Sequence, residues 1–152
     1  MLLQGHYQNA YVTADIEQAL ADLRQLQNVE NILQFEAPLE LWTPRGTGPA
    51  VMKIALAWIG NLQVEFIEPI SGLVDIYRDA VPASGVRFHH IGMRATDWDA
   101  LLAEIERQQL PIVLRGEMPG VKFLYADARK TLGHYLEYVL MPDAAWQGLG
   151  GR

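Results

Sequence analysis

Cysteine is absent from the 152 residues of this chain, so disulfide bonds, thiolate zinc sites and cysteine nucleophiles are all excluded. Any metal ion must therefore be bound by imidazole, carboxylate, amide or water ligands. A chain without cysteine is typical of the reducing cytoplasm, where we expect this protein to be located.

Basic residues are also scarce, because 12 lysines and arginines stand against 18 aspartates and glutamates and give a net charge of −6. They are scattered singly along the chain, so a surface for binding nucleic acid is not expected. Long apolar runs are missing as well. The longest, residues 54–60, is far too short to cross a bilayer, and the N-terminus has no pattern typical of a secretory signal. We therefore expect a globular protein that binds neither nucleic acid nor membranes.

The clearest pattern that is present is an internal repeat. Residues 8–23 (QNAYVTADIEQALADL) and residues 90–105 (HIGMRATDWDALLAEI) align at a constant offset, which pairs Gln8 with His90. Each segment predicts a short strand, a turn and then a helix, because apolar residues recur three and four positions apart in its second part. The repeat indicates two similar structural units.

Each predicted helix has a capping residue in front of it. Asp15 is placed to cap the first helix, and Thr96 or Asp97 is placed to cap the second. Strand-like segments follow each helix, separated by turn-like segments such as TPRGTGP at 43–49. The predicted strands are residues 31–35, 52–58 and 63–67 in the first half, and 112–115, 121–125 and 135–140 in the second.

Each half therefore predicts a β-α-β-β-β unit, and the fold class is α+β. We expect the first module in residues 1–70 and the second in residues 88–145. The segment 71–87 contains Pro82 and Gly85 and is interpreted as a linker.

The repeat extends to the last strand of each half. The segments LQVEFIEP and HYLEYVLMP each place one glutamate, Glu65 and Glu137, among apolar and aromatic residues. A buried carboxylate is costly unless it is paired or binds a metal. If the halves pack with pseudo-two-fold symmetry, these glutamates can meet Gln8 and His90 in one cavity. Such a set of nitrogen and oxygen ligands suits zinc, nickel, cobalt, manganese or iron.

Three segments carry a specific resemblance: HHIGMRATD at 89–97, EFIEP at 65–69 and GHYLEYV at 133–139. Together with the tandem modules they resemble the vicinal oxygen chelate superfamily. That group includes glyoxalase I, methylmalonyl-CoA epimerase, ring-cleavage dioxygenases and bleomycin-binding resistance proteins. The resemblance covers residues 5–142. It implies a curved mixed β-sheet around a cavity for metal and substrate, and assembly as a homodimer.

Carried over position by position, the resemblance implies that the metal ligands are Gln8, Glu65, His90 and Glu137. This combination is similar to that of glyoxalase I of the animal type, whereas epimerases and ring-cleavage enzymes have histidine at the first position. The implied function is a metal-dependent lyase, isomerase or epimerase that moves a proton next to a carbonyl through a metal-stabilised enediolate or enolate. Glu137 is the implied base, with Glu65 sharing that role. The implied substrate is a small molecule with vicinal oxygens or a carbonyl.

Two alternatives remain open at this point. His6 lies two residues before Gln8, hence on the same face of a regular strand, and it is a rival for the first ligand position. Two imidazoles and a carboxylate would instead suit an iron-dependent ring-cleavage dioxygenase. The other alternative is a non-catalytic protein of the resistance type that binds a small molecule. His89, next to His90, is expected on the opposite strand face in a packing or hydrogen-bonding role.

Overall fold

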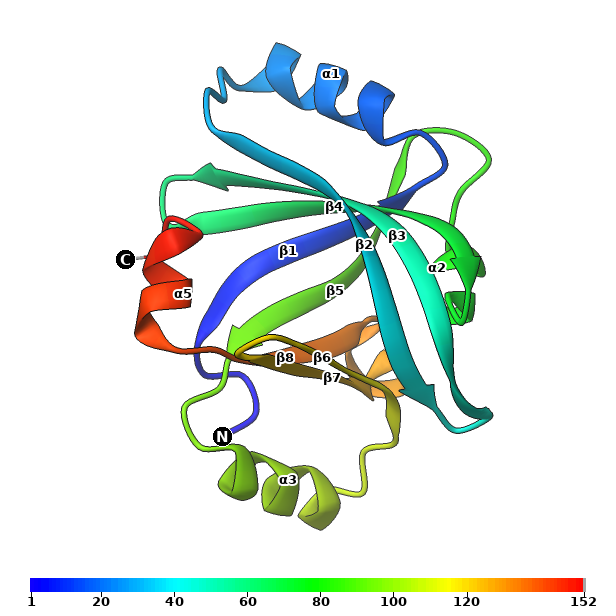
Figure 1. Ribbon diagram of the computed structural model, residues 1–152, viewed down its shortest axis with the longest axis vertical. Coiled ribbons are helices and arrows are strands. Elements are labelled where there is room, and N and C mark those ends of the chain that lie inside the picture. Colours follow the sequence, from blue (N-terminus) through cyan, green and yellow to red (C-terminus); the bar gives the residue numbers. More distant parts are fainter. Residues whose placement is uncertain (152) are drawn as a thin grey trace.

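The computed structural model describes residues 1–151, and in it two β-α-β-β-β modules close their eight strands into one mixed barrel (Figure 1). The first module consists of β1 (His6–Thr13), α1 (Ile16–Leu26), β2 (Ile32–Thr43), β3 (Gly46–Ile59) and β4 (Leu62–Gly72). The second consists of β5 (Val86–Arg94), α3 (Trp98–Arg107), β6 (Ile112–Met118), β7 (Val121–Asp127) and β8 (Tyr135–Leu140). The α+β class and the paired modules predicted from the sequence are thus confirmed.

The order of the strands decides which of them can share a site. Around the barrel they run β1-β4-β3-β2-β6-β7-β8-β5. Within each module the first and last strands pair in parallel, β1 with β4 and β5 with β8, while β1 and β5 pair antiparallel and join the modules. The strands β4, β1, β5 and β8 are therefore consecutive neighbours. Each of them carries one of the four predicted ligands.

The two long helices begin where the sequence predicts. The side chain of Asp15 accepts a hydrogen bond from the Gln18 backbone N–H at the start of α1, and Asp97 does the same for Ala100 at the start of α3. The cap of the second helix is thus Asp97 and not Thr96. Each helix covers the outer face of its own module's strands, where its apolar stripe packs over a separate hydrophobic cluster.

Three short helices complete the chain: α2 (Asp75–Arg78), α4 (Arg129–Leu132) and α5 (Asp143–Gly148). In Figure 1, α5 and α2 lie at opposite sides of the barrel, and the side chains of both reach into its interior cluster. Within residues 1–151 no helix has the length and apolar character needed to cross a membrane.

The strands of the first module extend beyond their predicted bounds. β2 and β3 are paired from Ile32–Ala57 to Thr43–Gly46, so the turn expected over 43–49 shrinks to a tight connection at Pro44 and Arg45. β4 continues to Gly72, which enters the segment interpreted as a linker. Gly72 has a φ of +79°, and a Cβ there would lie 2.0 Å from the Pro49 carbonyl oxygen, so the strand ends at a position that requires glycine.

Candidate metal centre

Three of the predicted ligands meet inside the barrel: Glu65 on β4, His90 on β5 and Glu137 on β8. His90 Nε2 lies 3.1 Å from Glu137 Oε2 and 3.5 Å from Glu65 Oε1, and one ligand atom of each residue lies within 4.8 Å of the others. All three side chains are buried. Ligands bound about 2.1 Å from one cation lie about 3.0 to 3.4 Å apart at octahedral or tetrahedral angles. The two measured separations therefore fit a shared cation with little rearrangement.

Gln8 stands beside this group on β1. Its side-chain Nε2 donates a hydrogen bond of 2.7 Å to Gln63 Oε1, which leaves Gln8 Oε1 buried without a hydrogen-bond partner within residues 1–151. The opposing residue of β5 is Gly92, where a Cβ would lie only 2.7 Å from that Oε1. A buried amide oxygen without a donor is costly, and a cation would satisfy it. The amide oxygen of Gln8 is therefore available to a cation in this part of the cavity.

Gln63 was not identified from the sequence, although a signal was there. It precedes Glu65 by two residues, and side chains two apart on a strand share one face. Both residues line the same cavity. Alternation along β4 from the recognised glutamate would have found Gln63.

The electrostatics of the centre also suit a divalent cation. Burial alone would lower the pKa of His90, but hydrogen bonds to Glu137 and Glu65, together with their charges, raise it to about 9. Burial raises the pKa of the Glu65 carboxyl, and the charge of Glu137 adds to that rise, against an opposing hydrogen bond from His90. Two acidic side chains and one imidazole thus share a buried place. A divalent cation held there would offset the negative charge of the ionised glutamates and would take the place of the Nε2 proton of His90.

His89 has the packing and hydrogen-bonding role expected of it, but the strand face predicted for it was wrong, because the strand is not regular at this point. Ala10 pairs with His90 and Tyr11 with Phe88, so β5 has a β-bulge at His89. The bulge turns His89 inward, where its Nδ1 lies 2.9 Å from Nδ1 of His90 and its ring stacks on Tyr77. A bulge depends on pairing with another strand, so period-two alternation could not reveal it.

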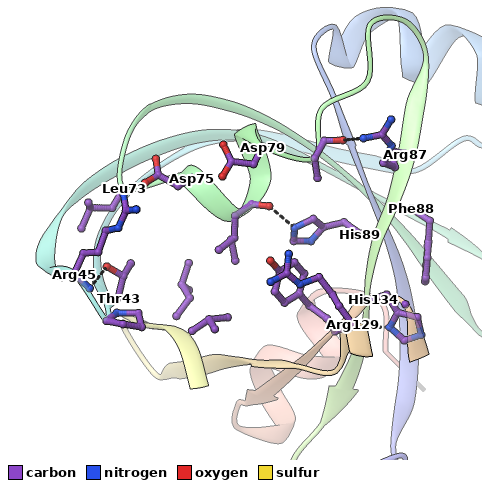
Figure 2. Close-up of a pocket in the computed structure, with 17 residues that line it drawn as sticks. Thr43, Arg45, Leu73, Asp75, Asp79, Arg87, Phe88, His89, Arg129 and His134 are labelled. Carbon is purple, nitrogen blue, oxygen red and sulfur yellow. Dashed lines mark hydrogen bonds and ion pairs between the residues drawn. The ribbon is translucent and has the colours of Figure 1, made fainter. Parts of the chain in front are cut away.

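His89 determines which nitrogen of His90 is free. Its Nε2 lies 2.9 Å from the Ile76 carbonyl oxygen, which can only accept, so His89 carries its proton there (Figure 2). Burial and the neighbouring His90 lower the pKa of His89 to about 3, which keeps the ring neutral and makes its Nδ1 an acceptor. His90 must then donate from Nδ1. Its Nε2 is thereby directed at Glu65 and Glu137 as the metal-binding atom.

His6, the rival for the first ligand position, lies outside the centre. Its side chain is exposed, and its Nε2 contacts Asn9 Oδ1 at 2.9 Å and the Gln8 carbonyl oxygen at 3.1 Å. A shift of register between His6 and Gln8 breaks the alternation that would have put both on one face. The set of two imidazoles and a carboxylate is therefore not formed among residues 1–151.

The centre opens into a cavity of about 250 Å³ within the barrel. Gln8, Gln63, Glu65 and Glu137 contribute polar side chains to it, Tyr7, Tyr77 and Tyr125 are aromatic residues with a hydroxyl group, and most of the remaining wall is apolar. That wall includes Phe35, Met52, Leu56, Phe123, Val139 and Met141. Among the described residues that line the cavity there is no lysine or arginine. The space next to the ligands is thus suited to an apolar molecule with few charges.

A second, larger cavity of about 560 Å³ lies beside α2 and is shown in Figure 2. Three arginines line it, and each has a partner: Arg45 pairs with Asp75, Arg129 pairs with Asp127, and Arg87 donates to the Ala80 carbonyl oxygen. The labelled side chains in Figure 2 surround this cavity, and His89 is its connection to the centre, because its ring lies between the cavity and His90. The ligand group itself faces the apolar cavity.

Comparisons with known proteins agree with this architecture. Residues 7–125 match the family model of the Glyoxalase/Bleomycin resistance protein/Dioxygenase superfamily, whereas no curated protein sequence matches the chain. The structure of methylmalonyl-CoA epimerase from Mycobacterium tuberculosis is similar with a TM-score of 0.66 at 14% identity, over 96% of this chain and 93% of that one. A variant of the Streptomyces coelicolor methylmalonyl-CoA epimerase, in complex with 2-nitronate-propionyl-CoA, gives 0.67 at 17% identity, over 93% and 96%. These TM-scores show a shared fold. The family model matches residues 7–125, most of the sequence, so the chain belongs to the Glyoxalase/Bleomycin resistance protein/Dioxygenase superfamily.

Proposed function

We propose that the protein is a metal-dependent enzyme that moves a proton on the carbon next to a substrate carbonyl, as lyases, isomerases and epimerases of this kind do. The observation that carries the proposal is the buried meeting of Glu65, His90 and Glu137 at the wall of a substrate-sized cavity. The likeness to methylmalonyl-CoA epimerases supports the same reaction class.

Gln8, Glu65, His90 and Glu137 would hold the divalent cation. When bound, it supplies Lewis-acid polarisation of the carbonyl, which a weakly acidic neighbouring C–H requires. Glu137 accepts the proton from that carbon, and the C–H electron pair moves toward the carbonyl oxygen. Glu137 then returns this proton to the neighbouring carbon, or Glu65, protonated beforehand, donates its own proton to the other face of the same carbon, which leaves Glu65 ionised and Glu137 protonated. The first outcome is an isomerisation and the second an epimerisation.

The apolar cavity limits which substrates fit. A substrate carboxylate placed away from the cation would be buried without a basic partner, because no lysine or arginine is among the described residues that line this cavity. The two negative charges of the glutamates cancel the two positive charges of the cation, so no positive charge remains to pair with a second anionic group of the substrate. We infer that the reacting part of the substrate has a carbonyl or vicinal oxygens and an apolar group, and no further charge.

The test measures exchange of the proton next to the carbonyl. Metal-loaded protein is incubated in D2O with uncharged aromatic α-hydroxyketones, and deuterium at the reacting carbon is followed by NMR. We expect exchange that needs the metal and falls by about 100- to 10,000-fold in Glu137→Gln, because the amide keeps a ligand oxygen but cannot take a proton.

Glu117→Gln, an exposed change on β6, is the matched control and should leave exchange unchanged. A protein that binds none of zinc, nickel, cobalt or manganese would overturn the proposal. So would exchange that persists in Glu137→Gln at the rate of the control.

A further inference from the structure

Gln63 is a buried polar residue that the four-ligand scheme does not use. It lies on β4 opposite Gln8 in the parallel ladder of β1 and β4, and only 1% of it is exposed. It lines the apolar cavity together with Gln8, Glu65 and Glu137. A neutral amide in such a place needs an explanation from its hydrogen bonds.

The hydrogen bond between the two glutamines has a direction. Gln63 Oε1 accepts from Gln8 Nε2, and this leaves two atoms without a partner within residues 1–151, Gln8 Oε1 and Gln63 Nε2. The first is an acceptor and the second is a donor with two N–H groups. The cavity therefore presents an amide oxygen and an amide N–H side by side.

Each unpartnered atom suits a different occupant. A cation attracts the oxygen of Gln8 and repels its N–H groups, so a bound cation favours the observed orientation of the Gln8 amide. Through the bond of 2.7 Å, that orientation holds Gln63 with its N–H groups unpaired. A substrate oxygen beside the cation is the acceptor that they lack. As the proton leaves, this oxygen gains negative charge, and a donor placed there stabilises it.

We propose that Gln63 is a catalytic residue whose Nε2 donates a hydrogen bond to the substrate oxygen that becomes negative during proton transfer. This inference rests on the proposed function. The cavity has no basic side chain among its described residues, so the proposed donor to the developing oxyanion is a neutral amide. The proposal also predicts a substrate whose oxygens lie side by side.

The experiment uses benzohydroxamate as the probe, a planar chelator with two vicinal oxygens and an apolar ring. Metal affinity and probe affinity are measured separately by calorimetry on the nickel-loaded protein. In Gln63→Glu the acceptor for Gln8 remains but the N–H groups are lost. We expect nickel to bind at least as tightly as in the wild type, while the probe binds at least 10-fold more weakly, in keeping with the about 100-fold effects of lost oxyanion donors.

Gln63→Met gives a second variant that buries no extra charge, and Gln25→Met, an exposed change on α1, is the control. We expect Gln63→Met to lose at least 10-fold in probe affinity as well, with nickel affinity within about 10-fold of the control. Unchanged probe affinity in both variants would overturn the proposal, and so would a wild-type protein that binds nickel but not the probe. A wild-type protein that binds no nickel would instead refute the metal-dependent function itself.

Discussion

The two modules place equivalent ligands on equivalent strands, yet they orient them in different ways. Gln8 on β1 and His90 on β5 occupy the same place in the repeat. Gln8 is held by Gln63, which lies beside it on β4 and accepts from its amide nitrogen. His90 is held by His89, its own neighbour on a β-bulge. The corresponding neighbour of His90 on β8 is Tyr135, whose ring packs against His89 instead.

This difference shows that the symmetry of the backbone brings the ligands together, whereas different neighbouring side chains orient the two ligands. An imidazole needs its far nitrogen engaged so that the near one can bind a cation, and the bulge supplies that partner. An amide needs its nitrogen engaged so that its oxygen faces the cation, and the neighbouring strand supplies that partner. As a result the glutamine pair leaves one donor, Gln63 Nε2, without a partner within residues 1–151, whereas the ring nitrogens of the histidine pair all have partners.

The largest expected effect compares the two ligands directly. His90→Ala removes the imidazole that contacts both carboxylates, and we expect metal affinity to fall by more than about 100-fold, beyond what the loss of a supporting residue costs. Gln8→Ala removes a neutral amide oxygen, a weaker ligand, and should cost about 10-fold. Calorimetric titration with zinc or nickel measures both. Equal losses in the two variants would contradict the unequal roles of the modules.

A smaller effect tests the support of His90. His89→Phe keeps an aromatic ring against Tyr77 and Tyr135 but removes the acceptor for His90 Nδ1. We expect metal affinity to fall by about 10- to 100-fold, because the tautomer of His90 is then no longer fixed. His134→Phe is a matched control outside the centre and should leave affinity unchanged.

Nitrogen-15 NMR reports the protonation of the His90 ring directly, and this signal would not change if His89 only filled space. In the metal-loaded wild type, His90 should carry its proton on Nδ1 alone, and this signal should be lost or mixed in His89→Phe. If the affinity and the His90 signal both match those of the control, the support assigned to His89 is wrong.

The repeat and its caps could be predicted from the sequence because they depend on local patterns. Asp15 and Asp97 precede apolar residues at helical spacing, and Glu65 and Glu137 interrupt apolar strands. These features belong to single segments of ten to twenty residues. The modules, the α+β class and the meeting of Glu65, His90 and Glu137 in a group able to hold a metal ion followed from them.

The features that could not be predicted depend on pairing between strands. The bulge at His89 is a shift in the register of β1 against β5. A second register shift between His6 and Gln8 breaks their alternation, so the two side chains do not share one face. The unpaired donor of Gln63 likewise follows from its place opposite Gln8. Each is a relation between two strands that lie at least 50 residues apart in the sequence.

The smallest expected effect concerns the outer helices, where the modules are most alike. Asp15→Ala and Asp97→Ala each remove one capping bond, of 3.1 Å and 3.0 Å, and each should lower the free energy of unfolding by about 1 kcal/mol. Within residues 1–151 only α1 has a second carboxylate that accepts a backbone N–H at its start, since Glu68 accepts from Ile16. Asp97→Ala should therefore be the more costly of the two in urea unfolding. Metal affinity should stay unchanged in both, and a larger loss in Asp15→Ala would show that Glu68 does not share the cap.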